Sequence, residues 1–97
     1  MMQVKVTRVY LNEEAPLLNE LFDYLQAKKI KGATIYRGVK GFGDSGKTRE
    51  TRFLDLHLDL PVVLEFFDEP QRIDEILSVF SEKIPPGHML QWLADVN

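Results

Sequence analysis

Cysteine is absent from the 97 residues of this chain. The chain therefore has no disulfide, no thiolate metal ligand and no thiol nucleophile. Glycine and proline are also scarce, with six and five residues, so the composition is not that of a linker or a low-complexity segment. The longest nearly apolar run, residues 60–67, is too short to cross a membrane, and no apolar leader follows Met1. We therefore expect one small, soluble, cytoplasmic domain with no membrane insertion.

Basic residues are not in excess either. The 12 lysines and arginines are outnumbered by 15 aspartates and glutamates, and the formal charge is −3. Nucleic-acid binders usually carry a basic surface, so we expect no nucleic-acid partner. The basic residues are unevenly placed, however, because five of them and only two acidic residues lie within 37–52. A positive segment on an acidic chain favours binding of an anion or of an acidic partner.

Apolar residues recur with two different periods along the chain. Alternation at every second residue predicts strands over about 2–11 and 89–96, an abundance of β-forming residues predicts a strand over 33–39, and a nearly apolar run predicts one over 60–67. The spacing i, i+3, i+4, i+7 predicts two helices, around 18–25 and 73–80, with proline near each start. The order predicts an α+β, ferredoxin-like β-α-β-β-α-β fold, in which an antiparallel sheet carries two helices on one face. We expect residues 1–97 to form this single domain.

The third predicted strand is apolar on both of its faces. Val62, Leu64 and Phe66 alternate with Val63 and Phe67. Two helices can cover only one face of a four-stranded sheet, and soluble monomers rarely expose a large apolar patch. A symmetric homo-oligomer would cover the second face. The alternative is that the long segment after the second strand folds back over it.

Residues 40–48, KGFGDSGKT, match two phosphate-binding patterns. Gly41, Gly43 and Gly46 form G-x-G-x-x-G, while Gly41 and residues 46–48 form G-x-x-x-x-G-K-[ST]. Glycines let successive backbone N–H groups face one anion, and Lys47 adds a positive charge. A P-loop enzyme also needs a helix directly after this segment, whereas 49–58 lacks a helical period. A small P-loop nucleotide hydrolase that uses Lys47 and Thr48 with magnesium is therefore the alternative, and a hairpin without a ligand is another.

Other polar residues give weaker signals. His57 and His88 are the only histidines and lack a metal-ligand spacing, so no metal site is expected. The carboxylate pairs 13–14 and 68–69 precede the predicted helices, where the helix dipole and solvation explain them. Trp92 lies on an alternating strand and is expected in the core or in an interface.

Three stretches together resemble the small PII-like family of bacteria and archaea: GATIYRGVKGFG at 32–43, DLPVVLE at 59–65 and IPPG at 84–87. The resemblance covers essentially the whole chain. Residues 40–43 are also similar to the segment that leads into the T-loop of PII signal-transduction proteins. The resemblance implies a homotrimer that binds a nucleotide or another small effector at clefts between subunits. A mobile T-loop-like segment, about 44–58 here, would report occupancy to a target protein.

The resemblance also implies ligand-binding residues. Gly43 matches a glycine that lies at the nucleotide in PII proteins, but Asp44 and Ser45 replace the arginine and glutamine that follow it there. The phosphate donors would therefore come from Gly46 and the basic residues after it. The expected ligand-binding set is Lys40, Gly41, Phe42, Gly43, Gly46, Lys47, Arg49, Arg52 and Gly87.

We expect a regulatory protein rather than an enzyme, with no catalytic residue and no resident cofactor. The expected partners are other copies of the chain, a small anionic effector, with a nucleotide as one candidate, and a target protein that contacts the segment 44–58. A trimer that binds no ligand and acts only as a scaffold is the remaining alternative.

Overall fold

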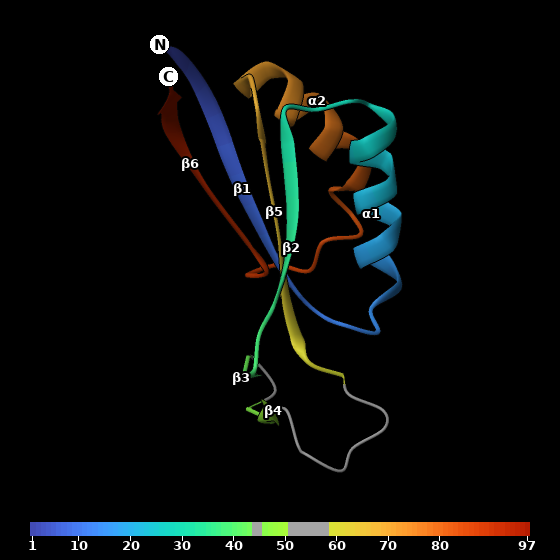
Figure 1. Cartoon of the computed structure of the whole chain (residues 1–97). Helices are drawn as coiled ribbons and strands as arrows, with labels where there is room; N and C mark the ends of the chain where they lie inside the picture. Colours follow the sequence, from blue (N-terminus) through green and yellow to red (C-terminus); the bar gives the residue numbers. More distant parts are fainter. Residues whose placement is uncertain (44–45, 51–58) are drawn as a thin grey trace.

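The computed structural model describes residues 1–43, 46–50 and 59–97, and its layers are shown in Figure 1. The main elements are β1 (Met2–Asn12), α1 (Pro16–Ala27), β2 (Gly32–Arg37), β5 (Pro61–Asp68), α2 (Pro70–Phe80) and β6 (Met89–Val96). The four main strands form one sheet in the order β2-β5-β1-β6, and every neighbouring pair is antiparallel. Both helices lie on one face of this sheet (Figure 1). The predicted ferredoxin-like fold is confirmed.

A second, two-stranded sheet was not predicted. Strands β3 (Lys40–Gly41) and β4 (Arg49–Glu50) form a small hairpin within the segment expected to be a loop. Strand β2 correspondingly ends at Arg37 rather than at residue 39. The hairpin lies at the end of the sheet opposite to the two chain termini, which lie near each other (Figure 1).

Helix α2 ends at Phe80, earlier than the prolines at 85–86 indicate. The chain turns there because the backbone N–H groups of Lys83 and Ile84 both donate to the carbonyl of Phe80, at 2.9 and 3.2 Å. Ile84 is thereby buried beside the helix that it follows. A buried apolar side chain, and not the proline pair, fixes the end of this helix.

The core lies between the helices and one face of the sheet. Phe66 and Leu64 of β5 are fully buried, as are Leu21 and Leu25 of α1 and Ile73 of α2. Burying side chains of this size stabilises the fold by about 1.5–3 kcal/mol each. The helical stripes predicted from the sequence are the buried ones, with Phe22 only partly covered.

The second face of the sheet carries no helix (Figure 1). Register places Tyr10, Val63 and Tyr36 side by side across β1, β5 and β2 on this open face. Leu90 and Trp92 of β6 extend the same face and remain 54% and 41% exposed. Trp92 is therefore not a core residue of the single chain. The alternative cover is the long segment of about 40–59, of which residues 44–45 and 51–58 lie outside the described residues.

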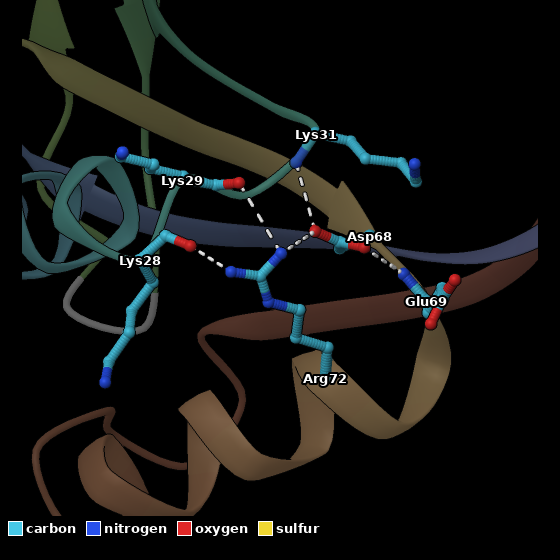
Figure 2. Close-up of polar contacts among 6 residues, drawn as sticks. All are labelled: Lys28, Lys29, Lys31, Asp68, Glu69 and Arg72. Carbon is cyan, nitrogen blue, oxygen red and sulfur yellow. Dashed lines mark hydrogen bonds and ion pairs between the residues drawn. The ribbon is translucent and has the colours of Figure 1, made fainter.

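One buried carboxylate joins the two helices. Asp68, at the end of β5, is 2% exposed and accepts hydrogen bonds from the backbone N–H groups of Lys31 and Glu69 at 3.1 and 2.6 Å. Its third donor is Nη1 of Arg72, at 3.1 Å (Figure 2). We call Asp68 and Arg72 the clamp. Asp68 is thus a buried acceptor, and the solvated helix-start role expected for it is wrong.

Arg72 also caps the end of α1. Its guanidinium donates to the carbonyl of Lys28, and to that of Lys29 at 3.5 Å (Figure 2). These carbonyls lie past the last turn of α1, where helix geometry leaves acceptors without an internal donor. Lys29 itself has φ of 53°, the left-handed conformation by which chains commonly leave a helix. The clamp therefore fixes how α1 turns into β2.

Candidate functional site

A hollow of about 920 Å³ lies where the ends of β1, β2 and β5 meet the β3–β4 hairpin. Its wall has two kinds of surface, one apolar and aromatic and one cationic. The apolar part includes Tyr10, Tyr36, Pro61 and Val63. The cationic part consists of Arg37, Lys40, Lys47 and Arg49. We call this feature the cationic hollow, because none of the described residues that line it is an aspartate or a glutamate.

Two glycines let the hairpin pack closely on the start of β5. The backbone N–H of Gly38 donates to the carbonyl of Pro61 at 2.7 Å. A Cβ atom added at Gly38 or Gly41 would lie only 3.0 or 3.1 Å from Cγ of Pro61. Contacts of that length are tighter than side chains normally make, so any larger residue would push the hairpin outward. The glycines therefore position the cationic side of the hollow.

Ion pairs hold three of the cationic side chains. Arg37 lies 3.0 Å from Glu13, Lys40 lies 3.6 Å from Glu50, and Arg49 lies 2.7 Å from Asp59. Asp59 uses its other oxygen to accept the backbone N–H of Glu14 at 3.0 Å. The hairpin is thereby tied to the turn between β1 and α1.

The carboxylates at 13–14 also require a correction. Helix α1 starts at Pro16, with Ala15 as its N-cap and no acidic residue in its first turn. Glu13 forms an ion pair with Arg37 rather than an interaction at the helix terminus. Its place before the helix is therefore explained by the end of β2, where Arg37 lies, and not by the helix dipole.

The far side of the hollow is formed by the turn before β6. Gly87 has φ of 84°, a conformation that glycine adopts without strain. His88 and Tyr10 are joined twice, because the Tyr10 N–H donates to the His88 carbonyl at 2.8 Å and Nδ1 of His88 lies 2.9 Å from the Tyr10 carbonyl. A carbonyl only accepts, so Nδ1 carries the proton. This pairing fixes His88 in the wall.

Sequence comparison gives the family. The model of the DUF190 family, described as "Uncharacterized ACR", matches residues 4–96. The chain belongs to this family. A "UPF0166 protein" of Aquifex aeolicus is 27% identical over 84 residues, which are 81% of this chain and 80% of that protein. The UPF0166 protein MJ1524 of Methanocaldococcus jannaschii is 32% identical over 89 residues, 87% of this chain and 82% of that protein.

Structure comparison shows a solved protein that shares the fold of this DUF190 chain. The chain is similar to CPII from Thiomonas intermedia K12, whose structure was solved bound to ADP and bicarbonate. The TM-score is 0.68 at 18% identity, and the match covers 98% of this chain and 87% of the other. The PII-like fold implied by the sequence resemblance is confirmed.

The structure brings most of the predicted ligand-binding residues of this DUF190 chain to one place. Those that line the hollow are Lys40, Gly41, Phe42, Gly43, Lys47, Arg49 and Gly87. Gly46 is described but is not in the wall; it has φ of 72° and its N–H donates to the Gly43 carbonyl at 2.8 Å. Arg52 lies outside the described residues. Ligand binding by these residues stays a prediction.

Sequence reasoning missed several wall residues. Tyr10 lies in no motif, and Tyr36 lies in the stretch 32–43 without being predicted to bind a ligand; only the strand register places them on either side of Val63. Arg37 was counted in the basic segment but was not assigned to the site. His88 follows the predicted Gly87 directly, so its proximity to that glycine was the available signal.

The P-loop alternative meets a strand where it needs a helix. After Gly46 the next described element is β4, at Arg49–Glu50.

Among the described residues no group of three or more histidine, aspartate or glutamate side chains could hold a metal ion, and His57 lies outside them. No helix in the described part of the chain is long and apolar enough to cross a membrane.

Proposed function

We propose that this DUF190 chain is a non-enzymatic, cytoplasmic regulator that assembles as a homotrimer and binds a nucleotide or another small anion in the cationic hollow. One observation carries the ligand class: four basic side chains line the hollow, and no carboxylate is among its described lining residues. A wall of one sign concentrates ligands of the opposite sign. The aromatic side, with Tyr10 and Tyr36, suits a ligand that also has an apolar or planar part. CPII, which shares the fold, was solved with two anions, ADP and bicarbonate.

The open face supports self-association. Tyr36, Leu90 and Trp92 are 50%, 54% and 41% exposed on it, and together they make a surface that water solvates poorly. Arg8 and Glu65 form an ion pair of 2.7 Å on the same face, and the Arg8 guanidinium lies 5.3 Å from the centre of the Trp92 ring. A surface with both signs of charge among apolar groups suits a second copy of itself. The PII-like resemblance supports three copies.

The position of the β3–β4 hairpin supports a role as the surface that a target protein contacts. The hairpin lies at the end of the sheet away from both termini (Figure 1). Its basic residues line the hollow on one side, so an occupied hollow changes the surroundings of the hairpin. A target protein would contact it together with residues 44–58.

Calorimetry tests the ligand class. Wild type is titrated with AMP, ADP, ATP, sodium bicarbonate and pyrophosphate, beside Lys40→Ala and the control Lys83→Ala. Lys83 is a paired, exposed lysine on the helix side of the molecule, where it contacts Glu20. We expect at least one anion to bind, with affinity reduced about three- to tenfold by Lys40→Ala and unchanged by Lys83→Ala. No heat and no thermal shift with any of the five anions would remove the effector proposal and leave a scaffold.

Light scattering after gel filtration tests the assembly. We expect a particle of three 11.2 kDa chains for wild type. Leu90→Glu places a charge on the open face and is expected to release monomers. Val79→Glu, at an exposed position of α2 on the helix side, is expected to leave the trimer intact. A wild-type monomer at micromolar concentration contradicts the trimer.

A phosphate-release assay separates regulator from hydrolase. We expect no magnesium-dependent turnover of ATP by wild type. Turnover that Lys47→Ala abolishes would favour the P-loop alternative instead.

A further inference from the structure

The ion pairs of the hollow share one arrangement. In each pair the cation belongs to the wall and the carboxylate does not, and the pairs are Arg37–Glu13, Lys40–Glu50 and Arg49–Asp59. An anion that enters the hollow therefore meets side chains already engaged by negative oxygens of the chain itself. Binding must then either share each cation or replace its carboxylate.

Two of these carboxylates are well placed to be replaced. The Lys40–Glu50 pair is long, at 3.6 Å, and its side chains are 66% and 38% exposed, so water can solvate Glu50 once Lys40 leaves. Asp59 holds Arg49 through one oxygen and the Glu14 backbone N–H through the other. It keeps that second hydrogen bond when Arg49 turns away. Neither carboxylate is left buried without a donor, which is the usual penalty for breaking an ion pair.

We propose that Glu50 and Asp59 are internal competitors of the ligand, and that the hollow selects anions with two or more charges. The inference rests on the proposed function. A diphosphate group offers enough oxygens to replace both carboxylates at Lys40 and Arg49, whereas a singly charged anion can replace only one. An exposed ion pair such as Lys40–Glu50 is worth a factor of about 1.4 to 5 in an equilibrium constant, and the shorter, partly buried Arg49–Asp59 pair is expected at the upper end of that range. Each carboxylate thus weakens binding by roughly that factor.

The release of these carboxylates also alters the hairpin. Glu50 closes β4 against β3, and Asp59 joins β4 to the turn before α1. An anion that takes over Lys40 and Arg49 loosens both ties. Ligand charge is thereby converted into a change at the base of the hairpin.

Calorimetric titration with inorganic pyrophosphate and with ADP tests the competition. The variants are Glu50→Gln, Asp59→Asn and the double variant; Asp74→Asn is the matched control, since Asp74 is a carboxylate paired with Lys5 at 2.7 Å on α2, away from the hollow. Each of these substitutions replaces a carboxylate by a neutral amide and so removes one negative charge. We expect about two- to fivefold tighter binding for each single variant, a larger gain for the double variant, and no gain for the control. The substitutions should increase the affinity for sodium formate, a monoanion, by less than they increase the affinity for pyrophosphate.

The outcomes separate this inference from the proposed function. Weaker binding in Glu50→Gln and Asp59→Asn would mean that the carboxylates position the cations, and unchanged binding would mean that they do not compete; either overturns the inference while the anion site stands. Binding that is measurable in these variants but not in wild type would support the competition. Absence of binding in wild type and in every variant removes the anion site, and the competition with it. Melting curves of Glu50→Gln, whose side chain is 38% exposed in wild type, are recorded beside the titrations and should match wild type if the fold is retained.

Discussion

Removing the carboxylate of the clamp should strongly destabilise the fold. Asp68 accepts three hydrogen bonds and its side chain is 3% exposed, so Asp68→Ala leaves the Lys31 and Glu69 N–H groups without this acceptor. It also removes the carboxylate partner of the Arg72 guanidinium, which keeps the carbonyls of Lys28 and Lys29. Breaking a fully buried ion pair costs about 3–5 kcal/mol. Arg72 is 42% exposed, and water therefore replaces part of the loss. We expect the free energy of unfolding to fall by about 3 kcal/mol, at the lower end of that range.

Arg72→Met removes the other half of the clamp. It leaves Asp68 with its two backbone donors and withdraws the cap from the carbonyls of Lys28 and Lys29. Because Arg72 is partly exposed, we expect a loss of about 1–2 kcal/mol. The double variant should lose less than the sum, with a coupling energy of about 1–2 kcal/mol, because the two side chains are in direct contact.

Urea unfolding, followed by circular dichroism at one fixed protein concentration, measures these values. The concentration is fixed because self-association would add to the apparent stability. In a domain of this size, 3 kcal/mol corresponds to a melting temperature lower by between about 12 and 24 °C. Asp74→Asn is the control, since it breaks an ion pair between α2 and Lys5 of β1 whose carboxylate is 59% exposed, and it should cost at most about 0.5 kcal/mol. An Asp68→Ala loss as small as the control's, or strictly additive single losses, refutes the clamp.

Further substitutions test packing, each by the same unfolding measurement. Gly32→Ala should lower the free energy of unfolding by about 1–3 kcal/mol, because the added Cβ would lie 2.6 Å from the Phe67 ring. Gly43→Ala is the control and should be nearly neutral, since a Cβ added there would have no atom within 4 Å. Equal effects of the two substitutions would contradict the packing of Phe67 on Gly32. Leu64→Ala should cost about 2–5 kcal/mol through the cavity that it leaves, against less than about 0.5 kcal/mol for Val79→Ala on the exposed side of α2. A small loss for Leu64→Ala would place this side chain outside the core.

The fold followed from the sequence because its signals are local. Alternation identifies β1 and β6, a nearly apolar run identifies β5, and the helical spacing identifies both helices, all without knowledge of tertiary contacts. The β3–β4 hairpin has strands of two residues, which carry no period. Its placement depends on Gly38 and Gly41 packing on Pro61, a contact between segments about twenty residues apart. Pattern reasoning therefore ended where the chain left the main sheet.

Part of the wall of the hollow was predictable for the same reason. Glycines and lysines within 40–49 are adjacent in sequence and form recognisable motifs, whereas Tyr10 and His88 meet across 78 residues through strand pairing. Asp68 shows the opposite difficulty. Its position before a helix indicates a solvated carboxylate, and only Arg72, one turn later, together with the Lys31 backbone makes it a buried acceptor. Residues whose role depends on distant backbone groups leave no local pattern.

The proposed ligand site and the proposed assembly surface share residues. Tyr10, Val63 and Tyr36 form one row of the open face and also line the hollow. A copy that covers the open face would therefore border the ligand, and we expect ligand affinity to depend on assembly. Such coupling is reciprocal: a ligand that binds the trimer tenfold more tightly than the monomer favours trimer formation by the same factor per site, or about 1.4 kcal/mol. Trimer dissociation measured with and without ADP reports this factor, and a factor of one would place the whole ligand site within a single chain.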